Sequence, residues 1–105
     1  MRAGDFARQM GQINANHRRG REFHRKALRA LVKRSNASLI APRGHVIGYR
    51  MPDGSVACIK QRFRSEEAAS AELLRIARHA SRSYIPVRAY LCDWCGGWHL
   101  TSRQH

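Results

Sequence analysis

The segment 91–100, LCDWCGGWHL, contains two cysteines, two tryptophans, two glycines and a histidine within ten positions. Two residues between Cys92 and Cys95 allow the chain to fold back so that both sulfurs face one point. Gly96 can adopt the positive φ of a tight turn, in which backbone amides approach a thiolate. Three structures are open to such a segment: a packed corner of a small core, a redox-active dithiol, or a metal-binding knuckle.

The spacing of the segment favours the metal-binding knuckle. Three residues separate Cys95 from His99, an interval common between metal ligands. A redox C-x-x-C normally opens a helix after a strand of a larger α/β fold, whereas two glycines and a tryptophan follow Cys95. Sulfur-rich tetrahedral coordination favours Zn²⁺, although iron would also suit these residue types. Inert buried thiols are the remaining alternative.

A tetrahedral site needs a fourth ligand, and Cys58 is the one cysteine outside the knuckle segment. A strand, a helix and a second strand would bring the chain back to Cys58. The predicted zinc ligands are therefore Cys58, Cys92, Cys95 and His99. If Cys58 is instead a small buried strand residue, His79 or His105 would complete the site. Four protein ligands leave no position for a catalytic water, so the zinc is expected to be structural.

A structural ion would also compensate for a small apolar core. Apolar residues make up 43% of the 105-residue chain, enough for one domain, and many of them are alanine. Structural zinc contributes about 10–16 kcal/mol of apparent binding energy, which is comparable to the whole stability of a small domain.

The periodicity of the chain predicts an α+β fold, which begins with a basic helical arm. Apolar residues at helical intervals indicate a marginal helix around Phe6, Met10 and Ile13 and a better one over 21–34. Residues 35–38 and 41–44 have the composition of linkers or turns. Strand-forming residues on both sides of Pro52-Asp53-Gly54 then predict a β-hairpin over 45–60, whose second strand covers about 55–60.

The strongest helix pattern covers residues 66–82, after Ser65 as the N-cap. Its predicted apolar stripe consists of Ala69, Leu73, Ile76 and Ala80, widened by Leu74 and Ala77. Residues 87–91 alternate as a half-buried strand does, with Val87, Ala89 and Leu91 on one face, and 98–102 form a short closing strand. We expect a basic helical arm over 1–38 and a zinc-binding α+β domain over 39–105, built as β-hairpin, helix and β-strands with the C-x-x-C knuckle.

From Cys58 to Ser102 the chain carries C-x-K-x-x-F-x-S-x-E-x-A and then A-Y-x-C-x-x-C-G-G-W-H-L-T-S. This pattern resembles a group of small zinc-ribbon-like proteins of actinobacteria and their phages. The resemblance implies a zinc-stabilised β-α-β unit with its ligands at Cys58, Cys92, Cys95 and His99. It covers somewhat under half of the chain, leaves out the basic N-terminal arm and implies no specific activity.

The chain has 20 Lys and Arg against 7 Asp and Glu, for a net charge of +13, and only three of the basic residues are lysines. Arginine forks match phosphate oxygens and stack on bases, so this composition favours a nucleic-acid partner, DNA or structured RNA. Phosphate contacts would give most of the affinity, which should fall steeply with salt. The predicted nucleic-acid-binding residues are Arg18, Arg19, Arg21, Arg25, Lys26, Arg29, Lys33, Arg34, Arg62 and Arg64.

Other functions are open to the same composition. A protein-interaction factor could dock on an acidic surface of a larger machine such as RNA polymerase, with zinc as its scaffold. An enzyme is not expected, because paired carboxylates and an H-x-E deaminase pattern are missing. No segment approaches the roughly 18–20 apolar residues of a membrane span, and no secretory signal is present. We therefore expect a cytoplasmic protein, associated with the nucleoid or the ribosome, whose three cysteines are poor candidates for disulfides.

Overall fold

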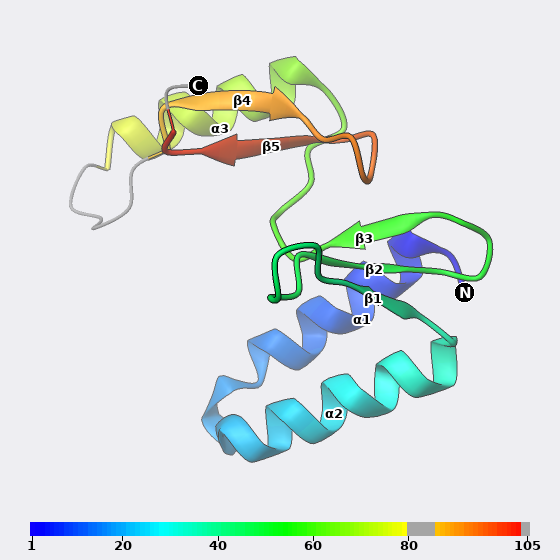
Figure 1. Cartoon of the computed structure of the whole chain (residues 1–105). Coiled ribbons are helices and arrows are strands. Elements are labelled where there is room, and N and C mark those ends of the chain that lie inside the picture. Colours follow the sequence, from blue (N-terminus) through cyan, green and yellow to red (C-terminus); the bar gives the residue numbers. More distant parts are fainter. Residues whose placement is uncertain (80–85, 104–105) are drawn as a thin grey trace. The chain divides into compact units, whose positions relative to one another are not determined.

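The computed structural model describes residues 1–79 and 86–103 of the chain (Figure 1). The elements in chain order are α1 (Ala3–Ala15), the 3-10 helix η1 (His17–Arg19), α2 (Gly20–Ser35), β1 (Ser38–Ile40), β2 (Gly48–Arg50), β3 (Val56–Cys58), α3 (Glu66–Ala77), β4 (Arg88–Leu91) and β5 (Trp98–Thr101). The predicted α+β class is confirmed. Among the described residues, no helix is both long enough and apolar enough to span a bilayer.

The chain divides into two compact units, Met1–Ile59 and Lys60–His105. In the first unit, α1 and α2 pack on a three-stranded antiparallel sheet of order β1-β2-β3 (Figure 1). Tyr49 of β2 lies opposite both Leu39 and Ala57, so these three side chains share one sheet face. The predicted division into a basic helical arm over 1–38 and a zinc-binding domain over 39–105 stays a prediction.

The core of the first unit joins the two helices to the sheet. Phe6 and Leu31 are fully buried, and the Phe6 ring packs on Tyr49 with ring centroids 4.9 Å apart. The cluster of buried core residues is Phe6, Met10, Leu31, Tyr49, Met51 and Ala57. This burial explains why α1, a marginal helix by its sequence, extends over 13 residues: tertiary packing of an apolar face supplies most of the stability of short helices.

Helix α2 confirms the predicted helix over 21–34, but the linker expected at 35–38 is wrong at both ends. Ser35 still belongs to α2, which Asn36 terminates with a left-handed φ of 57°. Strand β1 already begins at Ser38. Three residues are too few to show a strand periodicity, so β1 could be found only through its pairing with β2.

The hairpin around Pro52-Asp53-Gly54 is confirmed as β2 and β3. The Asp53 carboxylate accepts hydrogen bonds from the Ser55 hydroxyl at 2.6 Å and from the Ser55 amide at 2.9 Å. These hydrogen bonds lower the pKa of Asp53 below its ordinary value. Gly54 takes the positive φ of 90° that the turn requires. Strand β3 is shorter than predicted, because it ends at Cys58.

In the second unit, α3 packs beside the antiparallel hairpin β4–β5 (Figure 1). Ser65 caps α3 as predicted, because its hydroxyl accepts a hydrogen bond from the Ala68 amide at 3.1 Å. The helix buries Ala69 and Ile76. The predicted widening of its stripe is wrong, since Leu74 is 64% exposed and Ala77 is also exposed. The predicted helix over 66–82 is also too long, because α3 ends at Ala77 with Arg78 as its C-cap. Its predicted part at 80–82 lies outside the described residues.

Strands β4 and β5 confirm the two predicted C-terminal strands. The prediction that Val87, Ala89 and Leu91 form the buried face of the strand over 87–91 is wrong, however. Val87 is 52% exposed and Leu91 is 57% exposed, and of the three only Ala89 is half-buried. Alternation shows that a strand has two faces, but a two-stranded hairpin covered by one helix need not bury the more apolar of them.

Candidate metal centre and nucleic-acid interface

Three cysteines and one histidine lie close together in the structure. One ligand atom each from Cys58, Cys92, Cys95 and His99 falls within 4.8 Å of all the others. Zinc bonds of about 2.3 Å to sulfur and 2.0 Å to nitrogen set tetrahedral ligand atoms roughly 3.5–3.8 Å apart. Shifts of less than about an ångström would therefore bring all four atoms onto one ion. The donor set fits a metal site.

The loop between β4 and β5 forms the predicted knuckle, Cys92–Gly97. The Cys92 amide donates to the Gly97 carbonyl at 2.8 Å, and the Gly96 amide donates to the Cys92 carbonyl at 3.0 Å. Gly96 has a φ of 71°, which confirms the expected positive-φ turn. The loop closes on itself and holds its two sulfurs on the same side as His99.

Backbone amides approach both sulfurs of the knuckle. The Trp94 amide lies 3.4 Å from Cys92 Sγ, and the Gly97 amide lies 3.4 Å from Cys95 Sγ. Amide donors stabilise a thiolate more than a neutral thiol, and the thiolate is the form that binds metal. None of the three cysteines forms a disulfide. These contacts favour a metal-binding knuckle over inert thiols.

His99 is held so that one ring nitrogen faces the cluster. Its side chain is buried, and Nδ1 lies 2.8 Å from the Gln61 carbonyl oxygen. A carbonyl only accepts, so Nδ1 carries a proton, and Nε2 is the ring nitrogen left to bind a metal. Nε2 lies 3.3 Å from Cys95 Sγ, on the cluster side. Metal-bound histidines are commonly oriented in this way by a carbonyl on the other ring nitrogen.

The fourth member of the cluster, Cys58, is the last residue of β3 and lies opposite Gly48 in the sheet. Its place in the cluster agrees with the predicted ligand set. Of the two alternatives, His79 is not part of the cluster and His105 lies outside the described residues. The carbonyl of Gln61 was missed by the sequence reasoning, because every residue has a carbonyl and nothing in the sequence distinguishes this one.

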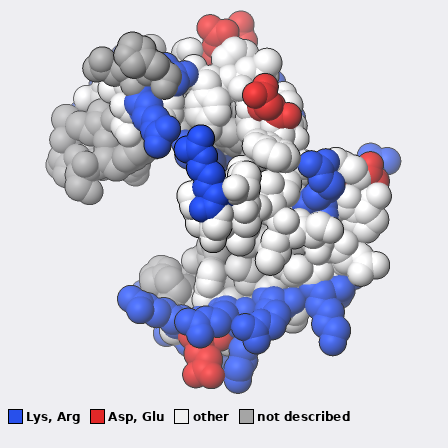
Figure 2. All heavy atoms as spheres, in the orientation of Figure 1, with Lys and Arg blue, Asp and Glu red and all other residues white. Residues whose placement is uncertain are grey.

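The predicted nucleic-acid-binding residues fall into two groups. Eight belong to the stretch from η1 through α2, where each side chain is exposed: Arg18, Arg19, Arg21, Arg25, Lys26, Arg29, Lys33 and Arg34. Figure 2 shows the basic side chains gathered over α2, at the lower edge of the view. The other two, Arg62 and Arg64, belong to the second unit. Arg62 packs against Gly97 of the knuckle, where an added Cβ would collide with its side chain.

Few of these cations are engaged within the protein. Lys26 is 3.8 Å from the Glu22 carboxylate, Arg19 covers the Phe23 ring, and Arg34 donates to Gln9 of α1 at 2.6 Å. Within residues 1–79 and 86–103, no carboxylate forms an ion pair with the other arginines of α2. Their guanidinium groups remain available to an outside anion.

Comparison of this chain with models of protein families, with curated proteins and with solved structures finds no match. The resemblance to zinc-ribbon-like proteins of actinobacteria and their phages therefore stays a prediction. Any function for the chain has to be argued from its own residues.

Proposed function

We propose that this chain is a small zinc-binding protein that binds nucleic acid through phosphate contacts and catalyses no reaction. The observation that carries the proposal is the basic face of α2, whose arginines form no ion pair with an acidic side chain of the described residues. Zinc is the structural part of the proposal, and the basic face is the functional part. As in the predicted zinc-ribbon resemblance, the metal would hold the fold and take no part in binding.

The ligand chemistry supports zinc among the possible metals. Three thiolates and one imidazole make a soft, four-coordinate set, which suits Zn²⁺ and leaves no open position for water or substrate. When bound, such an ion supplies folding energy rather than reactivity. Free cysteines are kept reduced in the cytoplasm, which is the compartment this proposal assigns, with association to the nucleoid or to ribosomes.

The geometry of the basic face supports phosphate binding. Arg21, Arg25 and Arg29 recur every four residues of α2, so their Cα atoms rise about 6 Å apart along one side of the helix. Each guanidinium can donate two parallel hydrogen bonds to a phosphate. A row of such donors tracks a phosphate backbone without selecting a base sequence, and its affinity falls as salt rises.

The acidic residues support a role without catalysis. Asp53 is engaged in the hairpin turn, and Glu72 accepts hydrogen bonds from Arg75 on the same helix. Glu66 and Glu67 lie in the first turn of α3, where carboxylates favour the helix dipole. These carboxylates have local structural roles, and none of them is paired with a second carboxylate as in acid–base catalysis.

Native mass spectrometry of the protein purified from cells, before and after nuclease treatment, tests both parts of the proposal. We expect one bound zinc ion and co-purifying nucleic acid that nuclease removes. If the zinc-bound protein co-purifies with an acidic protein that remains bound after nuclease treatment, the nucleic-acid part is overturned. That result would favour a protein-interaction factor that docks on an acidic surface. A protein without metal would overturn the zinc part.

A charge-matched pair of variants tests the position of the interface. Replacement of Arg18, Arg19 and Arg21 by alanine should weaken binding across nucleic-acid sequences, and it should reduce the log–log salt slope by about 0.7–0.9 for each phosphate that the variant no longer neutralises. The control replaces Arg43, Arg78 and Arg103 by alanine. These three residues are also exposed but lie outside η1 and α2. Equally weakened binding in the two variants would show a diffuse charge effect and overturn the α2 interface.

A further inference from the structure

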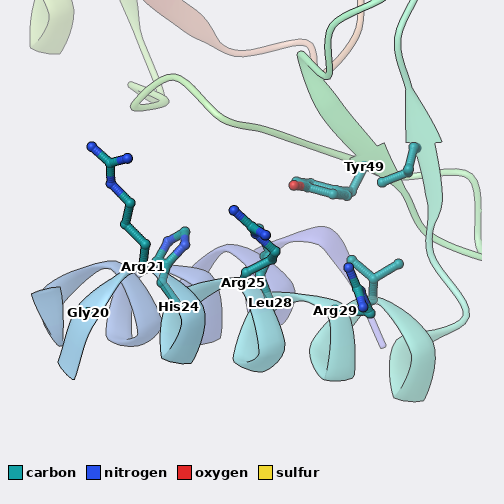
Figure 3. A pocket seen from close by; sticks show the side chains of 9 residues that line it. Gly20, Arg21, His24, Arg25, Leu28, Arg29 and Tyr49 are labelled. Carbon is teal, nitrogen blue, oxygen red and sulfur yellow. The ribbon is translucent and has the colours of Figure 1, made fainter.

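A groove runs along α2 in the first unit, between the helix and strands β1 and β2 (Figure 3). We name it the α2 groove. Its volume is about 570 Å³, within the range of about 300–1,000 Å³ that is usual for sites of small ligands. Arg21, His24 and Arg25 line the end at the start of α2, and Leu28, Val32 and Leu39 line the other end beside Arg29. The groove is therefore basic at the start of α2, and its apolar side chains gather near the end of the helix next to one arginine.

The apolar side chains of the groove gather toward the end of α2. Arg21 and Leu28 are seven residues apart on the same side of α2, which corresponds to about 10 Å along the axis. Figure 3 shows the side chains of Arg21 and Arg25 rising from the helix on the groove side. Leu39, from β1, is 59% exposed although it faces the helices with the rest of its sheet face. An apolar side chain is thus left open to solvent at the apolar end.

Tyr49 places one polar group in this apolar end. The residue is only 5% exposed, and its ring packs on Phe6. Its hydroxyl points into the groove above α2 (Figure 3) and forms no hydrogen bond with any of the described residues. Burial raises the pKa of Tyr49, so the hydroxyl stays protonated and can both donate and accept. None of the described residues has a fully buried side-chain polar atom without a partner, so this hydroxyl is open to the groove, where a bound ligand can reach it.

We propose that the α2 groove takes an unpaired nucleotide of a single-stranded nucleic acid, with its phosphate at Arg21 and Arg25 and its base against the apolar end. The Tyr49 hydroxyl then forms a hydrogen bond with the edge of the base. This inference rests on the proposed nucleic-acid-binding function and specifies which form of nucleic acid the protein binds.

The layout of the groove matches an unpaired nucleotide better than a nucleic-acid duplex. A nucleotide has its charge at one end and its flat, weakly polar base at the other. The groove offers Arg21 and Arg25 at one end, and apolar side chains beside the Arg29 guanidinium at the other. In a duplex the bases are stacked and paired, so a duplex could use the arginines but would leave the apolar end empty.

Arginine and tyrosine are also the residue types that recognise unpaired bases. Single-strand-binding proteins combine a positively charged groove with side chains that contact base faces. A guanidinium plane, such as that of Arg29 beside the apolar end, can itself stack on a base. The ribose 2′-hydroxyl is the group that distinguishes RNA from DNA.

Fluorescence anisotropy with the full, zinc-loaded chain tests the proposal. The probes are labelled oligo-dT and oligo-U of about ten nucleotides, within the site sizes of single-strand binders, and a DNA duplex of the same length. We expect at least about tenfold tighter binding of a single strand than of the duplex at equal salt. The two single-stranded probes separate DNA from RNA as the source of the nucleotide.

Three variants localise the binding. Tyr49→Phe keeps the buried ring and removes only the hydroxyl, and it should weaken single-strand binding about threefold to tenfold without changing duplex binding. Leu39→Ala changes an exposed side chain and should weaken single-strand binding about threefold. Arg25→Gln should cost about tenfold, whereas Arg43→Gln, at an exposed residue outside both the groove and the basic face of α2, should cost about twofold or less.

The outcomes separate this inference from the function on which it rests. Equal affinity for single strand and duplex, or unchanged single-strand binding by Tyr49→Phe, overturns the nucleotide site and leaves phosphate-mediated binding in place. If an acidic amphipathic peptide binds tightly and Tyr49→Phe weakens that binding, the groove is assigned to a protein partner. This outcome also overturns the nucleotide site. If the protein binds neither the single strands nor the duplex, the proposed function and this inference are both overturned.

Discussion

The two units of the chain bury different kinds of side chain. In the first unit, the largest fully buried side chains are Phe6, Leu31 and Met51, which are apolar and come from both helices and the β2–β3 hairpin. In the second unit, over its described residues 60–79 and 86–103, the largest is His99. The first unit has an apolar core, whereas the second unit buries a potential metal ligand and supplies three of the four, Cys92, Cys95 and His99.

This contrast shows how a short chain can obtain stability by two routes. A unit of fewer than about 60 residues buries a small share of its surface, so apolar burial alone leaves it marginal. The first unit gains enough because α1, α2 and the sheet cover one another. The second unit has one helix and one hairpin, and several of its apolar side chains remain exposed. A bound metal would supply the missing free energy.

Removal of the metal should produce the largest difference between the units. We expect Cys95→Ser, or treatment with a strong chelator, to unfold the second unit, because a structural zinc contributes about 10–16 kcal/mol of apparent binding energy. The first unit should keep its core. Amide hydrogen exchange followed by NMR gives the protection of each unit separately. Asp93→Asn changes an exposed knuckle residue outside the ligand set and serves as the control. A cooperatively folded, metal-free Cys95→Ser protein would contradict the structural role of zinc.

The next largest effect should come from a matched pair of truncations in the two units. Leu31→Ala removes a fully buried side chain from the apolar core and should lower the free energy of unfolding of the first unit by about 2–5 kcal/mol. Ile76→Ala should cost less in the zinc-loaded protein if, as we propose, a bound metal supplies most of the stability of that unit. Urea titration with probes in each unit measures both changes. Equal destabilisation would show that the second unit also depends on an apolar core.

The sequence predicted the second unit better than the first, and the physical reason lies in the type of signal. The Cys92–Gly97 knuckle and the Ser65 cap depend on residue types at fixed short spacings, which a sequence shows directly. The core of the first unit depends on contacts between distant residues: Phe6 meets Tyr49 only when the sheet has formed. Strand β1, the exposed face of β4 and the α2 groove are likewise results of tertiary packing, so periodicity alone could not predict them.

A glycine in β2 allows a smaller test at the ligand strand. In Gly48→Ala, the new Cβ would lie 3.0 Å from the Ala57 carbonyl oxygen and 3.3 Å from the Cys58 Cα. Since both are backbone atoms of β3, the strand has to shift, at a cost of about 1–3 kcal/mol. We expect weaker zinc binding in competition with a chromophoric chelator, because Cys58 moves with its strand. Unchanged zinc affinity would show that the ligand set tolerates displacement of Cys58, or does not need it.

The smallest predicted effect concerns the first unit alone. Gly11 lies within α1, its φ is not positive, and an added Cβ would meet no atom within 4 Å. Alanine is favoured over glycine inside a helix by about 0.8–1.0 kcal/mol, so Gly11→Ala should stabilise the first unit by up to that amount. Zinc affinity and the protection of the second unit should not change. If Gly11→Ala weakened zinc binding, as Gly48→Ala is expected to do, apolar packing and metal binding would not be separate sources of stability in the two units. An unchanged zinc affinity, combined with a higher urea midpoint for the first unit alone, would support apolar packing in one unit and metal ligation in the other.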